Sequence, residues 1–201
     1  VGVEKLKDTG VRGLGPTPNP IHPTYEVGFT APGQYALAAT RYFQRYGFTP
    51  EEGKRLLAKI AVKNHRNGIR NPKAHLRREI TLEQVMNAPI ICWPLGLYDC
   101  CGVTDGAAAA IMCRAEDAKA FRNDYILVKG LGVSVGAGMG NITNEYDYTH
   151  WEETEWASRE AYTMAGISNP RRDLDLAEVH DCFTIAELIA VESLSVCDKG
   201  K

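Results

Sequence analysis

This 201-residue sequence lacks the patterns that would identify a membrane-spanning, a secreted or a nucleic-acid-binding protein directly. It has no continuous apolar run of the length that a bilayer requires. Its first residues, Val1 to Lys5, lack the charged start and apolar centre of a signal peptide and read instead as a strand entering a loop. A formal net charge of −2 offers no positive field to a nucleic-acid backbone. These absences leave a globular protein, with enough chain for a hydrophobic core, as the predicted class.

Metal-binding cysteine patterns are missing too. The six cysteines include the adjacent pair Cys100 and Cys101, but no Cys-x-x-Cys pair and no Cys/His set has the ligand spacing of a zinc site. We therefore expect no metal in this chain. A chain of this size can fold around its apolar core without disulfides, so free thiols in a reducing cytoplasm are favoured over disulfide bonds.

The first half of the chain contains three predicted helices. Gly and Pro recur from Gly10 to Pro32 and predict a long loop, after which Tyr and Ala side chains at helical spacing predict a helix from Pro32 up to Gly47. Thr49–Glu52 and Thr81–Gln84 have the capping-box pattern, in which two side chains bond backbone N–H groups of the first turn. The sequence therefore predicts one further helix at each box.

The second half alternates between strands and helices. The predicted elements, in order, are the strand Tyr125–Val128, a helix from the capping box Thr149–Glu152 to Gly166, the strand Leu174–His180 and a helix that begins with the capping box Thr184–Glu187. This order predicts an α/β fold with a largely parallel sheet. The alanine-rich run Ala107–Cys113 suits a helix by propensity, and it equally suits a strand buried on both faces.

The most informative stretch for chemistry is His180-Asp181-Cys182-Phe183, between a predicted strand and a predicted helix. Ligands bind at the carboxyl ends of strands in open α/β sheets, and a helix N-terminus favours negative charge there. An imidazole N–H at this place can stabilise an oxyanion that develops on a thioester carbonyl. The alternative is a structural histidine bonded to its own turn, and the position alone does not decide between the two.

Three cysteines invite a catalytic interpretation. The predicted helix N-terminus lowers the pKa of a thiol at Cys182, but Asp181 opposes ionisation, and a cysteine between strand and helix is usually core. Cys100 and Cys101 have apolar neighbours and no basic partner nearby in sequence. Core packing is therefore the favoured interpretation for all three.

Other polar and glycine-rich segments have structural explanations. Gly132–Gly140 lacks the Gly-x-Gly-x-x-Gly spacing, which favours a loop over a phosphate cradle. Lys63-Asn64-His65 lies at a predicted helix end, where positive charge suits the helix dipole. We expect His22 and His75 to be solvated in loops and His150 to lie at the surface.

Five stretches, taken in order, carry a resemblance to a known family. The sequence resembles thiolases of the sterol-carrier-protein type and their bacterial and archaeal acetyl-CoA acetyltransferase-like relatives over nearly its whole length. The stretches are Gly2–Lys5, Lys63–His65 with Asn71-Pro72, Cys100–Ala110, the helix end Ala161–Gly166, and Glu178–Phe183.

The resemblance implies an α/β fold of the layered αβαβα, thiolase-like type. Residues 1–125 would be the end of the N-terminal half of such a protein, with an inserted loop domain at about residues 10–86 that covers the coenzyme A site. Ala107–Cys113 would be the last strand of that half, and residues 126–201 would start the C-terminal half.

The chemistry implied by the resemblance is Claisen condensation of acyl-CoA thioesters or its thiolytic reverse, with coenzyme A as a substrate. A cysteine carries the acyl group, and two oxyanion holes stabilise the charged intermediates. In this subfamily the histidine that matches His180 points at the thioester oxygen. The nucleophilic cysteine, the histidine of a Gly-His-Pro motif and a second cysteine would lie before Val1 or beyond Lys201, so none of the six cysteines here inherits a role and a longer native chain is expected.

Two alternative functions remain open at the level of sequence. One is a thiolase-like retro-aldolase or acyltransferase that lacks the cysteine, and the other is a non-catalytic acyl-CoA-binding scaffold. The resemblance also implies a homodimer, a small zinc-ribbon/OB-fold partner protein and a role in lipid or aromatic acid degradation. Tyr25, Phe29, Tyr35 and Tyr148 either line a pocket for a bulky or aromatic acyl group, such as that of benzoylsuccinyl-CoA, or pack the loop domain.

Overall fold

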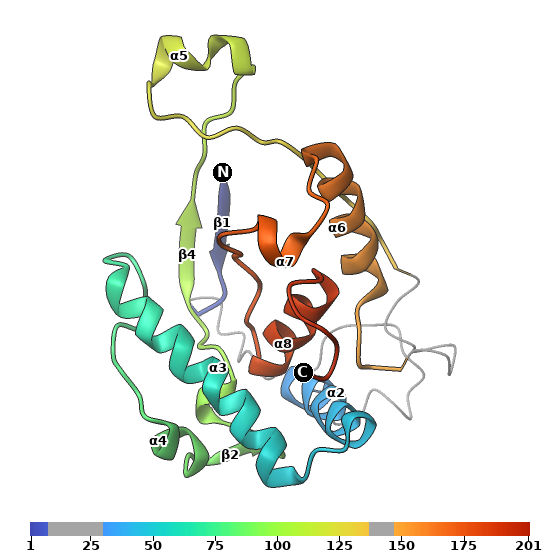
Figure 1. The fold of residues 1–201 in the computed structure, drawn as a ribbon. Coiled ribbons are helices and arrows are strands. Elements are labelled where there is room, and N and C mark those ends of the chain that lie inside the picture. Colours follow the sequence, from blue (N-terminus) through green and yellow to red (C-terminus); the bar gives the residue numbers. More distant parts are fainter. Residues whose placement is uncertain (8–29, 137–146) are drawn as a thin grey trace, which may run out of the picture.

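The computed structural model describes residues 1–7, 30–136 and 147–201 (Figure 1). Helices make up most of the regular structure, and the strands are short. The helices are α2 (Ala31–Tyr46), α3 (Pro50–Arg70), α4 (Leu82–Met86), α5 (Ala118–Phe121), α6 (Glu152–Ala165), α7 (Pro170–Asp173) and α8 (Thr184–Ser193), the strands are β1 (Gly2–Lys5), β2 (Ile90–Cys92), β3 (Leu95–Gly96) and β4 (Asp105–Ala108), and two 3-10 turns are η1 (Leu97–Asp99) and η2 (Ala115–Asp117). No helix in these described ranges is both long enough and apolar enough to cross a membrane.

Side-chain caps set the starts of the helices in the first half. The capping boxes of Thr49 with Glu52 and of Thr81 with Gln84 are both formed, which confirms the two predicted starts. The end of α2 at Gly47 is confirmed as well, because that residue adopts a left-handed conformation with φ of 72°. The predicted helix end at Lys63–His65 is wrong, because α3 continues through Asn67-Gly68 to Arg70. It ends before the Asn71-Pro72 turn, where the residue preceding a proline disfavours the helical conformation.

The helices of the second half begin without the predicted side-chain caps. Helix α6 begins at Glu152 after Trp151, and α8 begins at Thr184 after Phe183, and neither preceding residue makes a side-chain cap. The hydroxyl of Thr184 instead donates to Asp99 Oδ1 at 3.0 Å, so a tertiary contact takes the group that the capping box would use. The predicted end of α6 at Gly166 is confirmed by its left-handed φ of 73°.

The strands of the described residues pair in an antiparallel manner. β1 pairs with β4 so that Gly2 lies opposite Ala108 and Lys5 opposite Asp105, and β2 pairs with β3. The predicted strands Tyr125–Val128 and Leu174–His180 are not strands here, and the predicted parallel sheet is not formed among the described residues. A strand requires a hydrogen-bonded neighbour, which these two segments lack within the described ranges.

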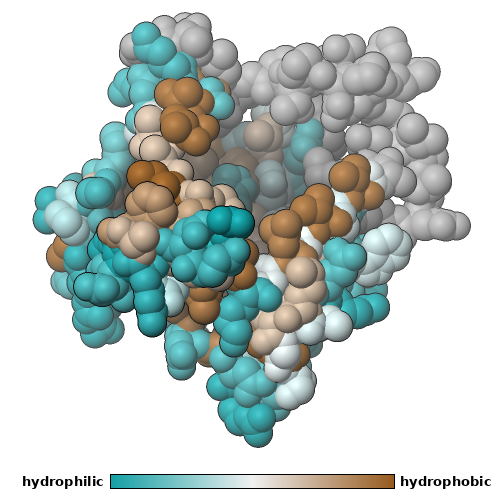
Figure 2. Space-filling model, turned by 90° about the horizontal axis from the view of Figure 1, so that it is seen from above, coloured by the Kyte–Doolittle hydropathy of each residue, from teal (hydrophilic) through white to brown (hydrophobic). Residues whose placement is uncertain are grey.

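β4 corrects the prediction for the alanine-rich run. The strand begins at Asp105, two residues before the predicted start at Ala107, and ends at Ala108, where its pairing with β1 stops. The chain beyond it is irregular and leaves Ile111 98% exposed and Met112 80% exposed. Figure 2 shows exposed apolar side chains in separate groups on the end of the molecule where α5 lies.

The hydrophobic core joins α8 to the two long helices of the first half. Tyr42 of α2, Leu57 of α3 and Ile185 and Ile189 of α8 are fully buried in one cluster, to which Leu95 also belongs. Helix α8 also packs on α6, so it is covered on several sides (Figure 1). This burial fixes the position of the helix N-terminus that follows the His180 turn.

The glycines of the segment before residue 137 allow close packing on α6. A Cβ atom at Gly130 would lie 2.1 Å from the carbonyl oxygen of Ala161, and one at Gly132 would lie 1.8 Å from that of Ala157. The side chain between them, Leu131, is 65% exposed. Close helix packing therefore explains these glycines, whereas residues 137–140 of the predicted loop Gly132–Gly140 lie outside the described residues.

Candidate functional site

The turn that carries His180 is attached to the rest of the protein at the residues that follow the histidine. The carbonyl oxygen of Cys182 accepts a hydrogen bond from the N–H of Cys101 at 2.9 Å. The ring of Phe183 stacks on Tyr35 of α2, with ring centroids 4.5 Å apart, and Phe183 forms an isolated antiparallel bridge with Cys100. The backbone at 182–183 is thus held between α2 and the segment that leads into β4.

Asp181 points to α3. Its Oδ2 atom accepts a hydrogen bond from Asn64 Nδ2 at 2.5 Å, whereas its buried Oδ1 atom has no partner among the described residues. Burial raises the pKa of Asp181 to about 6, the Asn64 hydrogen bond lowers that pKa, and the nearby charge of Glu187 raises it. Asn64 is therefore the first of the groups that stabilise the charged form of Asp181, and the charges of Lys63 and His180 lower its pKa as well.

A second carboxylate, Glu187, shares the same amide. Asn64 Nδ2 donates to Glu187 Oε2 at 2.5 Å, and Lys63 Nζ pairs with Glu187 Oε1. Glu187 is 5% exposed and lies in the first turn of α8. Lys63-Asn64-His65 is thus not a helix end whose charge suits the dipole, as predicted. Lys63 and Asn64 bind carboxylates of the His180 region, and His65 Nδ1 contacts the carbonyl oxygen of Arg78 at 2.9 Å.

His180 lies on the surface of this turn. Its side chain is exposed, and among the described residues it has no hydrogen-bond partner. The predicted alternative, a structural histidine bonded to its own turn, therefore has no such bond in the described ranges. The exposed imidazole can reach a ligand, whereas the three residues after it face protein.

A cavity of about 480 Å³ lies behind the turn, on the side of α3. Asp181, Asn64 and His65 line it together with Cys101 and Tyr98. His180 is not among its lining residues. The histidine and the aspartate that follows it thus contribute to different surfaces.

The three cysteines considered for catalysis have raised thiol pKa values. Burial, followed by the charge of Asp99, raises the pKa of Cys100 to about 12. Burial is also the main cause of the raised pKa values of Cys101 and Cys182, although a hydrogen bond with Tyr35 opposes the effect at Cys182. Thiols with raised pKa values stay protonated at neutral pH, which does not favour a nucleophilic role. Cys100 and Cys182 are partly buried against the main core cluster, as the packing interpretation predicts, whereas Cys101 is exposed, so core packing is wrong for that residue. All six cysteines are free thiols in the structure.

The remaining predicted residues lie apart from this turn or outside the described ranges. His75 is exposed, and His150 Nδ1 lies 2.8 Å from Asp147 Oδ1. Tyr35 and Tyr148 pack against the main core cluster. His22, Tyr25 and Phe29 lie outside the described residues. Within the described ranges, no group of three or more His, Cys, Asp or Glu side chains is placed to hold a metal ion.

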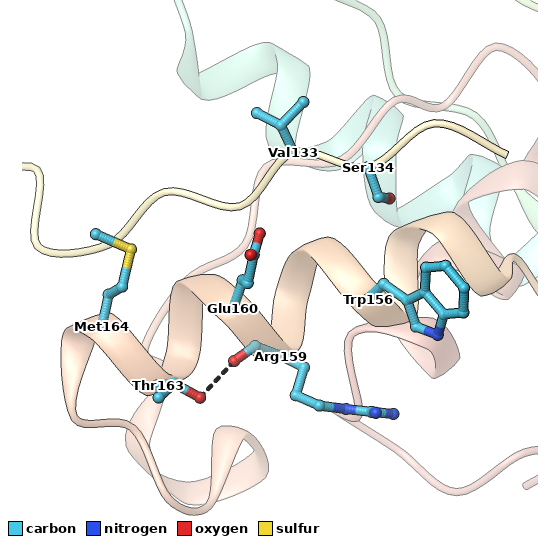
Figure 3. A pocket seen from close by; sticks show the side chains of 7 residues that line it. All are labelled: Val133, Ser134, Trp156, Arg159, Glu160, Thr163 and Met164. Carbon is cyan, nitrogen blue, oxygen red and sulfur yellow. Dashed lines mark hydrogen bonds between the residues drawn. The ribbon is translucent and has the colours of Figure 1, made fainter.

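Another cavity, of about 570 Å³, lies between α6 and the extended segment before it. Figure 3 shows Val133 and Ser134 of that segment opposite the α6 side chains Trp156, Glu160 and Met164. Neither a histidine nor a cysteine lines this cavity. We therefore place the candidate site at the His180 turn.

Comparisons of this chain with family models, with named proteins and with solved structures indicate one and the same protein family. Residues 135–201 match the family model described as thiolase C-terminal domain-like. The acetyl-CoA acetyltransferase of Methanothermobacter thermautotrophicus is 37% identical over 205 residues, covering 100% of this chain and 50% of that protein. The benzoylsuccinyl-CoA thiolase subunit BbsB of Thauera aromatica is 36% identical over 87% of this chain and 43% of the subunit.

A solved structure is also similar. The Ltp2-ChsH2(DUF35) aldolase superposes with a TM-score of 0.67 at 27% sequence identity, over 83% of this chain and 43% of that chain. The chain spans about half the length, or less, of the relatives that it matches.

Proposed function

This chain belongs to the thiolase superfamily and has its thiolase-like α/β fold, and from that premise we propose that it is part of an enzyme acting on acyl-CoA thioesters. The reaction is 3-oxoacyl-CoA thiolysis or its reverse, the Claisen condensation performed by an acetyl-CoA acetyltransferase. In thiolysis, the bond between the α and β carbons breaks and the thiol of coenzyme A ends on the shortened acyl group. Similarity to named acetyl-CoA acetyltransferases over the whole length of this chain supports the proposal.

His180 is the catalytic residue that we assign within the chain. The observation that carries this assignment is an exposed imidazole on a turn whose next three residues are bound to α2, α3 and the Cys100–Cys101 segment. An imidazole N–H held in this manner donates a hydrogen bond to the thioester carbonyl oxygen and stabilises the negative charge that develops there. The N-terminus of α8, which starts four residues later, adds a favourable potential.

The acyl-carrying cysteine of this proposal lies outside residues 1–201. Burial raises the pKa values of the thiols of Cys100, Cys101 and Cys182, and in the part of the chain that the structure describes none of them is hydrogen-bonded to a base that could activate it. Residues 1–125 then end an N-terminal half, with the loop domain at about residues 10–86, and residues 126–201 start a C-terminal half. The family-model match that begins at residue 135 supports that division.

A retro-aldolase is the second candidate, because the similar solved structure is an aldolase. The two reactions differ in their use of free coenzyme A. A thiolase consumes it when it cleaves a 3-oxoacyl-CoA, whereas a retro-aldolase releases a carbonyl product from a β-hydroxyacyl-CoA without it.

The deciding assay uses the native protein that includes the acyl-carrying cysteine proposed outside residues 1–201. It incubates this protein with each substrate class, with and without free coenzyme A, and identifies products by mass spectrometry. We expect cleavage of the 3-oxoacyl-CoA that depends on coenzyme A. Cleavage of the hydroxyacyl substrate alone would move the assignment to the aldolase, and saturable acyl-CoA binding without any turnover would leave a binding scaffold.

The names of two similar proteins also support an assembly of several subunits. BbsB is named as a subunit, and the name of the similar aldolase includes a DUF35 component. We propose a homodimer that also binds a small zinc-ribbon/OB-fold protein in the cytoplasm. The acyl group is aromatic or bulky in this proposal, and its support is the 36% identical BbsB. Tyr35 and Tyr148 give it no support, because they pack against the main core cluster.

A further inference from the structure

Asn64 connects α3 to both sides of the junction between the His180 turn and α8. Its Nδ2 atom lies 2.5 Å from Asp181 Oδ2 and 2.5 Å from Glu187 Oε2. One amide NH2 group carries two hydrogens, so both of its donors are used. The first acceptor directly follows His180, and the second belongs to the first turn of α8.

The charges around this amide explain why a neutral donor is placed there. Glu187 is paired with Lys63, while Asp181 has Asn64 as its hydrogen-bond donor and a second oxygen that is buried without a partner. The charged groups that face Asp181 are Glu187, Lys63 and His180. Two close carboxylates repel each other and lose hydration on burial, and a shared donor reduces both costs. Without Asn64, Asp181 would gain by moving to water.

We propose that Asn64 is a positioning residue for His180. By holding Asp181 against α3, it fixes the backbone of the turn and with it the direction in which the imidazole points. His180 makes no hydrogen bond of its own in the described residues, so its direction is set through this neighbour. The inference rests on the proposed function of His180. When a catalytic group is displaced by about 1 Å, the reaction rate falls about 100-fold.

The core contacts of α3 are made by other residues. Leu57, Ala58 and Ala61 are buried, whereas Asn64 is half-buried and contributes no apolar side chain to either core cluster. Loss of the amide therefore leaves the apolar packing of α3 intact. The expected effect of a substitution falls on turnover more than on folding.

The test is made in the native protein that includes the acyl-carrying cysteine. It compares Asn64→Ala, which removes both hydrogen bonds, with Asn64→Ser, whose single hydroxyl can serve one carboxylate. Asn67→Ala is the matched control, because Asn67 is exposed on the same helix, three residues on. We expect kcat for thiolysis to fall about 10- to 100-fold in Asn64→Ala, and by less in Asn64→Ser, with KM changed less than about threefold. The control should stay within about twofold of wild type.

A second readout does not depend on turnover. NMR titration of the Asp181 carboxyl should show its pKa falling toward the usual value of about 3.9 in Asn64→Ala, because the released turn exposes Asp181 to water. A pKa that rises instead would mean that Asp181 stays buried without Asn64, and it would overturn the inference. If Asn64→Ala does not fold, the same titration is read in Asn64→Ser.

The two assays separate the failure of this inference from failure of the proposed function. Wild-type kcat in a folded Asn64→Ala variant would remove the positioning role and leave the thiolase proposal standing. A wild-type protein without any thiolysis would remove the proposed function, and the carboxyl titration would still decide whether Asn64 holds the turn.

Discussion

Replacing Asp99 with alanine removes a buried carboxylate that three parts of the fold share. Asp99 is 1% exposed. Its Oδ2 atom accepts from the N–H of Gly96 at 2.8 Å and lies 3.4 Å from Lys54 Nζ on α3, and its Oδ1 atom accepts from the hydroxyl of Thr184 at the start of α8. Asp99→Ala thus affects three donors at once.

The magnitude follows from the burial of the ion pair. The Lys54 side chain is 12% exposed, and after the substitution its remaining acceptor among the described residues is the carbonyl oxygen of Pro94 at 3.2 Å. Removing one partner of a buried ion pair costs about 3–5 kcal/mol, mostly because the other charge stays buried and uncompensated. We expect a loss in this range, which is a large part of the ~5–15 kcal/mol by which domains are stable.

Urea unfolding followed by circular dichroism measures this loss. Asp175→Ala is the control, because Asp175 is exposed, and it should change the free energy of unfolding by less than about 0.5 kcal/mol. The double variant Lys54→Met with Asp99→Ala should lose less than Asp99→Ala alone, since no charge is left buried. A loss below about 1 kcal/mol in Asp99→Ala would refute the reasoning, because a charge-pair role predicts several times more.

Three smaller predictions test local features. Thr49→Ala should lower the free energy of unfolding by about 1 kcal/mol through loss of the α3 cap, and an unchanged urea midpoint would contradict that role. Gly132→Ala should lower the free energy of unfolding by about 1–3 kcal/mol because its Cβ would meet Ala157, whereas Gly106→Ala, which has open space, should show no such clash. Equal melting temperatures of the two variants would count against the packing explanation. Between about pH 4 and 6 the folded chain keeps a proton on Asp181 that the unfolded chain has lost, so stability should fall as pH rises through that window, and Asp181→Asn should reduce the slope.

Local side-chain chemistry made part of the fold predictable. Thr49 and Thr81 cap their helices with neighbours three residues away, so a short pattern holds all the necessary information. Thr184 has the same pattern, yet its hydroxyl bonds Asp99, 85 residues earlier, and the predicted box does not form. Strands failed for a similar reason: Tyr125–Val128 needs a hydrogen-bonded neighbour that a single segment does not specify.

The motif of the candidate site could be predicted from the sequence, but the residues that hold its turn in place could not. The stretch from His180 to Phe183 stands out in the sequence because of its residue types. Lys63 and Glu187 are 124 residues apart, and Asn64 and Asp181 are 117 apart, so no periodic pattern links them. The available signal is a group of polar residues on a long amphipathic helix, and a helix-dipole interpretation of Lys63–His65 does not account for their contacts with Asp181 and Glu187.

The role of His180 is tested most directly by the kcat for coenzyme A-dependent thiolysis of a 3-oxoacyl-CoA, in the native protein that includes the acyl-carrying cysteine. The kcat of His180→Ala is measured beside those of wild type and His150→Ala. His150 is paired with Asp147 and is not among the residues that line the cavity behind the turn. We predict a fall of about 100- to 1,000-fold in kcat for His180→Ala, because one donor to the developing oxyanion is lost, and a value near wild type for His150→Ala. Full activity in a folded His180→Ala variant would contradict the role of His180 in thioester chemistry.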